Sequence, residues 1–186
     1  MSGRAHEENG QTIAFVLLDR FSMNAFASVI EPLRIANRLL GRDHYVWTTY
    51  SLDGNSVTAS NGCEVAVKNS IRELHDADIT LLCTGIDVER LPLDADLGNK
   101  LRRLNAMGRT FGAICTGAYL LARYHLLDGR RCTIHWENLR SLREEFPDVE
   151  VTSDIFAIDR NCITCAGGMA SLDMMLRLIA IQHGAY

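Results

Sequence analysis

Apolar residues follow two alternating patterns along this chain. Runs of consecutive apolar residues, as in 12–18 and 78–83, are typical of strands buried on both faces of a parallel sheet. Between such runs lie longer segments, such as 24–40 and 97–107, in which apolar residues recur every three or four positions, the period of an amphipathic helix. The alternation predicts an α/β fold: a doubly wound, mostly parallel sheet with helices on both faces.

The remaining predicted elements are shorter. We expect further strands over 45–52, 111–114, 132–134, 156–159 and 162–165, and a strand or hairpin at a sheet edge over 57–67. We expect further helices over 116–124, 138–146 and from 167 to about 182.

Composition places these elements in one domain. The chain has 186 residues, of which 47% are hydrophobic, enough for a single full core. Residues 1–11 are polar and are predicted to be a disordered tail before a domain over 12–186. The first apolar run is too short for a signal peptide and lacks its basic flank, so we expect a cytoplasmic protein.

Charge gives no sign of a nucleic-acid or membrane partner for this chain by itself. The formal net charge is −4, and acidic and basic residues are interspersed. Paired arginines such as Arg130 and Arg131 are predicted to lie on solvated faces.

The six cysteines are expected to be thiols in the cytoplasm. Cys162 and Cys165 form a Cys-x-x-Cys pair, but on a strand their side chains point to opposite faces. No second such pair and no histidines at ligand spacing accompany them, so we expect no metal site and no cofactor.

Cys115 lies where a short apolar strand turns abruptly into a helix. The sequence Ala113-Ile-Cys115-Thr-Gly117 resembles the G-x-S-x-G nucleophile elbow, with Ala in place of the first Gly. A cysteine at a helix N-terminus feels the positive end of the helix dipole, which favours the thiolate and lowers the pKa. The alternative is a buried structural cysteine, a common place for this residue type.

Functional sites in doubly wound sheets lie beyond the carboxyl ends of the strands. The residues at those ends are therefore expected to share one crevice, and they are Asp19, Gly85, Cys115, His135 and Gly167.

Four motifs then point to a known family. They are Ala-Ile-Cys115-Thr-Gly-Ala, Leu-Leu-Asp-Gly129-Arg, Cys-Thr-Ile-His135-Trp136-Glu and Ile-Thr-Cys165-Ala-Gly-Gly. In this order they resemble the ThiJ/PfpI-like domain of GlxA-type AraC-family transcriptional regulators. The resemblance implies a flavodoxin-like, class I glutamine amidotransferase-like fold. The resemblance covers residues 13–183. It implies an effector-sensing domain of a homodimeric regulator, whose DNA contacts are made by a C-terminal helix-turn-helix domain of a longer protein. A naturally short homologue is the alternative.

The resemblance also bears on catalysis. Many enzymes of the superfamily have His directly after the nucleophilic Cys, whereas this chain has Thr116. A helix carboxylate of those enzymes corresponds to Ser28 here. Glu31 lies three residues later on roughly the same helix face, and its carboxylate either enters the pocket from there or faces solvent beside Arg34. Cys115 and His135 are left as nucleophile-like and base-like residues, and we interpret the set as degraded. A small-molecule sensor is thus favoured over two alternatives: a working Cys-dependent hydrolase or lyase, and a cysteine redox or stress protein.

The effector is predicted to be a zwitterion. Glu31 and Trp136 together suit a cationic head group, while backbone N–H groups at Gly85 and Thr116 suit a carboxylate. The alternative is that Trp136 is a core residue and Glu31 faces solvent. The remaining residues assigned to the ligand site are Cys115, His135 and Gly167. The resemblance agrees, since such regulators include sensors of betaine-like and basic amino-acid metabolites.

Overall fold

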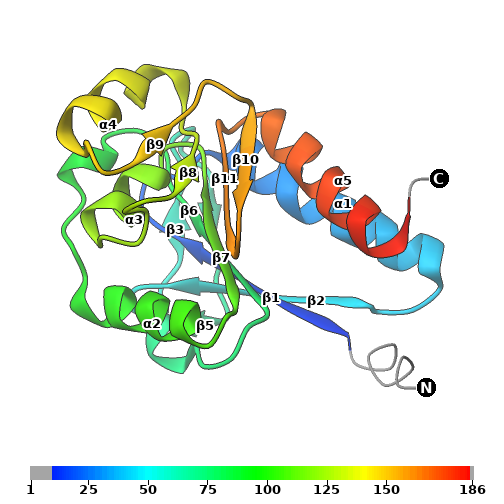
Figure 1. The fold of residues 1–186 in the computed structure, drawn as a ribbon. Coiled ribbons are helices and arrows are strands. Elements are labelled where there is room, and N and C mark those ends of the chain that lie inside the picture. The colour runs from blue at the N-terminus through cyan, green and yellow to red at the C-terminus, as the bar shows by residue number, and fades with distance from the viewer. Residues whose placement is uncertain (1–9, 185–186) are drawn as a thin grey trace.

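A computed structural model describes residues 10–184, and it contains a seven-stranded sheet between two layers of helices (Figure 1). The strand order is β10-β11-β7-β6-β1-β2-β5. Neighbouring strands are parallel except for the antiparallel pair β10–β11. The strands are β1 (Gln11–Leu17), β2 (Tyr45–Ser51), β5 (Asn69–Ser70), β6 (Ile79–Cys83), β7 (Thr110–Ile114), β10 (Phe156–Asp159) and β11 (Cys162–Cys165). The predicted fold class is confirmed.

The helices divide between the two faces of the sheet (Figure 1). One face carries α1 (Met23–Leu40) and α5 (Ala170–His183); the other carries α2 (Ala95–Ala106) and α3 (Ala118–Arg123), with α4 (Leu139–Glu145) beyond them. In the central strand β1, Phe15 packs in the core layer beneath α1, whereas Val16 packs in the layer beneath α2 and α3. The strand is buried on both faces, as its unbroken apolar run predicts.

Helix α1 begins and ends at residues suited to those positions. The Ser22 side chain accepts a hydrogen bond from the main-chain N–H of Ala25 at the N-terminus. Gly41 ends the helix in the left-handed conformation, with φ of 67°.

Three short segments differ from the sequence predictions. The predicted edge hairpin forms a separate two-stranded sheet, β3 (Val57–Thr58) with β4 (Glu64–Val65), and β5 is the edge strand of the main sheet. Strand β8 (Arg131–Cys132) pairs with β9 (Glu150–Val151), which the sequence did not predict. Elements of two residues are too short to show a hydrophobic period, so pattern analysis cannot place them.

The predicted N-terminal tail is slightly too long. Gln11 already belongs to β1, and its N–H donates to the carbonyl of His44 over 2.6 Å. The rest of that prediction, over residues 1–9, lies outside the described residues. Within 10–184, no helix has the length and apolar character needed to span a membrane.

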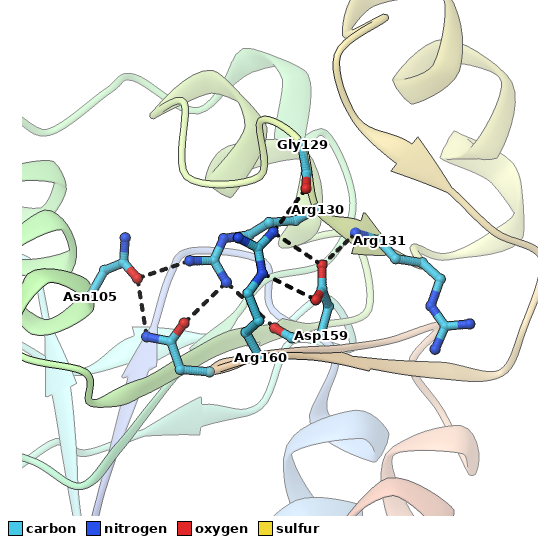
Figure 2. A network of polar contacts seen from close by, with 7 residues as sticks. Asn105, Gly129, Arg130, Arg131, Asp159 and Arg160 are labelled. Atoms are coloured by element: carbon cyan, nitrogen blue, oxygen red, sulfur yellow. Dashed lines mark hydrogen bonds and ion pairs between the residues drawn. The ribbon is translucent and has the colours of Figure 1, made fainter.

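Arg130 is buried, which corrects the prediction of a solvated side chain (Figure 2). Its guanidinium donates to Asn161 Oδ1 over 3.0 Å and to Asn105 Oδ1 over 3.1 Å, and lies 5.4 Å from the centre of the Phe111 ring. Amide oxygens and a ring face therefore replace the water that a guanidinium would otherwise bind. Through these contacts, Arg130 at the start of β8 connects the end of α2 with the β10–β11 turn.

Candidate functional site

The predicted strand-to-helix turn is present at Cys115. Strand β7 ends at Ile114 and α3 begins at Ala118. Cys115 has φ of 61°, a left-handed conformation that is costly for a residue with a Cβ atom. A Cβ on Gly117 would lie 2.8 Å from the Ala113 Cβ, so only glycine fits the turn at that position. This geometry is that of a nucleophile elbow.

The Cys115 thiol is nevertheless not activated. Burial raises its pKa to about 11, and the hydrogen bond from the Thr116 main-chain N–H offsets only part of that rise. Nearby Cys165 and Glu137 raise the pKa further. The prediction of a lowered pKa is wrong, because removal of the thiolate from water outweighs the dipole of the six-residue helix α3. At neutral pH the group is a neutral thiol.

Cys115 lies in the wall of a pocket of about 510 Å³ at the carboxyl ends of the central strands. The lining residues carry hydroxyl, carboxylate, thiol, imidazole and amide groups as well as an apolar side chain: Ser22, Ser60, Gly85, Ile86, Asp87, Glu89, Cys115, Thr116, His135, Glu137 and Asn138. We call this space the Cys115 pocket. It brings together four of the residues predicted for the ligand site: Gly85, Cys115, Thr116 and His135.

Two threonines join the loop after β6 to the elbow. Thr116 Oγ1 donates to the carbonyl of Gly85 over 2.5 Å, and Thr84 Oγ1 lies 2.9 Å from Thr116 Oγ1. Since the Thr116 hydroxyl has one proton, which goes to Gly85, Thr84 must be the donor to Thr116. A Cβ on Gly85 would lie 2.1 Å from the carbonyl oxygen of Arg20, so this loop can approach the segment between β1 and α1 only with glycine there.

His135 contacts the elbow through its main chain, where its N–H donates to the Cys115 carbonyl over 3.0 Å. Its Nδ1 lies 3.5 Å from Glu137 Oε2, an electrostatic contact without hydrogen-bond geometry. Within residues 10–184 this buried Nδ1 has no hydrogen-bond partner, and no side-chain hydrogen bond joins the imidazole to the thiol. A nucleophile and a base in direct contact, as thiol catalysis needs, are therefore not assembled in this geometry.

Gly167 packs against Cys115 and does not line the pocket. Its φ is 85°, and a Cβ there would lie 2.8 Å from both Cα and Cβ of Cys115 and 3.1 Å from its sulfur. The close approach requires the absence of a side chain. Asp19, also expected in the crevice, lines a different hollow, beside Tyr124.

Glu31 does not line the Cys115 pocket. Of the two predicted alternatives, the structure has the second, a solvent-exposed Glu31 beside Arg34. It does share a helix face with Ser28, as predicted, but that face borders a separate groove between α1 and α5. Glu31 is exposed, and its Oε2 lies 2.7 Å from Arg34 Nη2. The hydrogen bond from Arg34 lowers the pKa of Glu31.

Trp136 is also outside the lining of the Cys115 pocket. Its side chain is 71% exposed, and its ring centre lies 5.5 Å from that of His135. The indole therefore borders the site from outside and does not enclose a ligand in this conformation.

Three carboxylates in the lining were missed by the sequence analysis: Asp87, Glu89 and Glu137. Asp87 pairs with Arg20, and Glu89 accepts a hydrogen bond from Asn138. None of the described lining residues is Lys or Arg, so the pocket has an acidic rim. All three lie close in sequence to residues that were predicted, Gly85 and His135. Their direction depends on two short 3-10 turns, η2 (Val88–Arg90) and η3 (Trp136–Asn138), which the sequence pattern did not predict.

Cys162 and Cys165 point to opposite faces of β11, as predicted. Cys162 packs in the core layer of α2 and Cys165 in that of α1. Across residues 10–184 no group of three or more His, Cys, Asp or Glu side chains is placed to hold a metal ion.

The pocket and fold together define a class of protein: a flavodoxin-like domain with a cysteine elbow at the carboxyl ends of its strands. Residues 12–181 match the DJ-1/PfpI family. The chain is 43% identical to the HTH-type transcriptional regulator GbdR of Pseudomonas aeruginosa over 176 residues, which cover 95% of this chain and 48% of the relative. It is 35% identical to the HTH-type transcriptional regulator GlxA of Rhizobium meliloti, with 99% of this chain and 57% of the relative covered.

The fold is also similar to that of a solved transcriptional regulator. The crystal structure of an AraC family transcriptional regulator from Pseudomonas putida has a TM-score of 0.83 and 32% identity, covering 94% of this chain and 93% of that chain. The chain belongs to the DJ-1/PfpI family, and its relatives include helix-turn-helix transcriptional regulators. It spans about half the length of the curated relatives it matches.

Proposed function

We propose that this chain is the small-molecule-sensing domain of a cytoplasmic AraC-family transcriptional regulator, with the effector bound in the Cys115 pocket. The observation that carries the proposal is a preserved elbow and pocket around a thiol whose pKa is raised to about 11 and which has no base in contact with it. Such a site can hold a ligand without reacting with it. The relatives named as transcriptional regulators support the same assignment.

The effector is a betaine-like or amino-acid zwitterion. The acidic rim favours a cationic head group chiefly through Glu89 and Glu137, because Asp87 is already paired with Arg20. These residues take the role that the sequence analysis assigned to Glu31. At the elbow, the Thr116 N–H that faces the Cys115 thiol is a donor for the ligand carboxylate. The unpaired Nδ1 of His135 offers a further polar contact.

Signal output in this proposal depends on two partners. The domain forms a homodimer, and a helix-turn-helix region elsewhere in the protein binds DNA. Effector binding favours one arrangement of the dimer and so changes the placement of the DNA-binding regions.

A thermal-shift screen tests the proposal. Glycine betaine, carnitine and arginine are compared with acetate and succinate, because a ligand that binds only the folded state raises the melting temperature. We expect at least one zwitterion to raise the melting temperature in a saturable manner, and the acids to have no effect. Stabilisation by the acids alone contradicts the proposed effector class.

A hydrolase or lyase is the second candidate, favoured by the strained elbow itself. The isonitrile hydratase of Pseudomonas putida is 28% identical to this chain over 135 residues. Turnover of an isonitrile or amide that is abolished by Cys115→Ser would establish this function in place of the sensor.

A further inference from the structure

The sequence predicts Asp19 in the Cys115 crevice, but the structure places it in the lining of a second hollow, of about 270 Å³. The lining residues come from the ends of β1 and β2, from the segment after β6, and from α2 and α3. They include Leu18, Asp19, Leu91, Leu97, Leu120 and Tyr124. We call this space the Asp19 hollow.

The Asp19 hollow lies at the change of direction in the sheet. From β1 the chain moves to β2 and β5 on one side, and then crosses to β6 and β7 on the other side. In doubly wound sheets, ligands bind beyond the carboxyl ends of the strands at this point. Leu18 and Asp19 directly follow β1, and Leu91 lies in the segment after β6, so the hollow is in the position where a ligand is expected.

Buried apolar side chains make up much of the lining. Leu18 is 5% exposed, and Leu97 and Leu120 are each 1% exposed. Protein interiors are otherwise packed so closely that voids larger than a water molecule are few. An apolar cavity of about 150 Å³ is enough for benzene. A hollow of about 270 Å³ therefore has room for an aromatic ring with a short substituent.

Asp19 gives this lining a negative charge. Within residues 10–184 its carboxylate has no hydrogen-bond or ion-pair partner. The other carboxylate in the lining, Asp94, accepts a hydrogen bond from the Leu97 N–H over 2.8 Å at the start of α2. None of the described lining residues is Lys or Arg. A cationic group is therefore favoured beside Asp19.

Tyr124 adds an aromatic ring to the lining. Its hydroxyl donates to the Asp94 carbonyl over 2.9 Å and accepts from the Asp94 N–H over 3.1 Å, and both bonds hold the ring in place. A Cβ on Gly98 would lie 2.7 Å from two atoms of this ring, so a side chain at residue 98 would displace it. An aromatic ring and a carboxylate together suit an ammonium group.

We propose that the Asp19 hollow is a second ligand site, which binds a small primary amine with an apolar body the size of an aromatic ring. The body lies among the buried leucines, and the ammonium group faces Asp19 and Tyr124. Because the described lining has no cationic side chain, an amine without a carboxylate binds in preference to a zwitterion. This inference goes beyond the proposed function, since none of the residues of the Asp19 hollow lines the Cys115 pocket.

Chemical-shift titration of the labelled chain tests the site with benzylamine and its neutral analogue benzyl alcohol. We expect benzylamine to bind saturably with a dissociation constant of about 1 mM or less. The largest amide shifts should be at Leu97, Leu120 and Tyr124. Asp19→Asn should weaken benzylamine about fivefold or more and leave benzyl alcohol unchanged. The matched control is Asp96→Asn, an exposed carboxylate of α2 outside the lining, which should change neither affinity.

A blocking variant tests the location by a second route. Leu91 is half-buried in the lining, whereas Leu93 on the same segment is 45% exposed and lies outside it. Leu91→Trp places an indole in the hollow and should abolish binding of both compounds, while Leu93→Trp should retain it. Melting temperatures of the two variants show whether each is folded, and Asp19→Asn decides the proposal if Leu91→Trp is not.

Three results would overturn the proposal. The first is the lack of saturable binding of benzylamine to wild type up to about 10 mM. The second is an affinity for benzylamine that neither Asp19→Asn nor a folded Leu91→Trp changes. The third is a set of shifts centred on Cys115 and His135 that Glu137→Gln removes, which would place the amine in the Cys115 pocket. The sensing proposal is decided separately, because Asp19→Asn should keep the zwitterion-induced rise in melting temperature.

Discussion

Thr116 donates its hydroxyl proton to the carbonyl of Gly85 over 2.5 Å and so joins the loop after β6 to the Cys115 elbow. The residue directly after Cys115, which the resemblance predicts to be His in an active enzyme, is a threonine whose hydroxyl connects two segments of the pocket wall. Both threonines of this contact, Thr84 and Thr116, are buried.

Loss of the Thr116 hydroxyl should therefore destabilise the pocket wall. Thr116→Val leaves the Gly85 carbonyl and the Thr84 hydroxyl unpaired, and we expect a loss of about 1–3 kcal/mol in the free energy of unfolding by urea. Thr116→Ser keeps the hydroxyl and should lose about 1 kcal/mol or less, from the missing methyl group. Equal losses in the two variants would show that the hydrogen bond has no special role.

The close contact of Gly167 with Cys115 predicts a second stability difference. Gly167→Ala combines a strained φ of 85° with a Cβ only 2.8 Å from Cys115 Cα. Gly62 has the same φ of 85° but open space around it, so Gly62→Ala measures the strain alone. We expect about 1–2 kcal/mol of destabilisation for Gly62→Ala and clearly more for Gly167→Ala in chemical denaturation. The contact is unimportant if the two values agree.

The raised pKa of Cys115 predicts slow alkylation. With a pKa of about 11, about one molecule in ten thousand carries the thiolate at pH 7. Cys63 is the exposed cysteine among the described residues and should react with iodoacetamide first. Because a raised pKa moves ionisation to higher pH, the rate at Cys115 should rise about tenfold for each pH unit until close to pH 11.

Peptide mapping over pH 7 to pH 10, in a range where circular dichroism shows a folded chain, measures these rates. Faster labelling of Cys115 than of Cys63 at pH 7 would mean that the thiol is activated. That result would return the enzyme and redox functions to consideration.

The Arg130 contacts (Figure 2) predict a large effect at a residue outside the pocket lining. Arg130→Met removes two hydrogen bonds to amide oxygens and should cost about 2–4 kcal/mol in the free energy of unfolding. Arg140→Met is the control, since Arg140 is highly exposed and pairs only with Glu144 in the described structure; it should change stability by about 0.5 kcal/mol or less. Equal effects would mean that the buried contacts do not stabilise the fold.

The features that could be predicted are those set by residues close to one another in the sequence. The apolar runs identified every strand of the main sheet except the two-residue β5. The Cys115 elbow was predictable because a strand, a cysteine and a glycine adjoin in the sequence. Gly85 and His135 followed from the rule that strand ends meet at one edge of a parallel sheet.

Features with a tertiary cause were not predictable. The pKa of Cys115 depends on how completely other segments cover it. For Glu31 the helix face was predicted correctly, but not which hollow that face borders. Arg130 is buried because Asn105 and Asn161, from distant parts of the sequence, supply its acceptors.

The central claim is that the effector binds in the Cys115 pocket through its acidic rim, and calorimetric titration tests this most directly. Glycine betaine, carnitine and arginine are titrated into wild type, Glu137→Gln and Glu31→Gln. Glu137 lines the pocket, while Glu31 lines the separate groove between α1 and α5 and is the matched control. We predict that at least one zwitterion binds wild type, that Glu137→Gln weakens it about tenfold or more, and that Glu31→Gln leaves its affinity unchanged. Binding that is lost in Glu31→Gln and kept in Glu137→Gln, or no binding of any of the three compounds to wild type, would contradict the account.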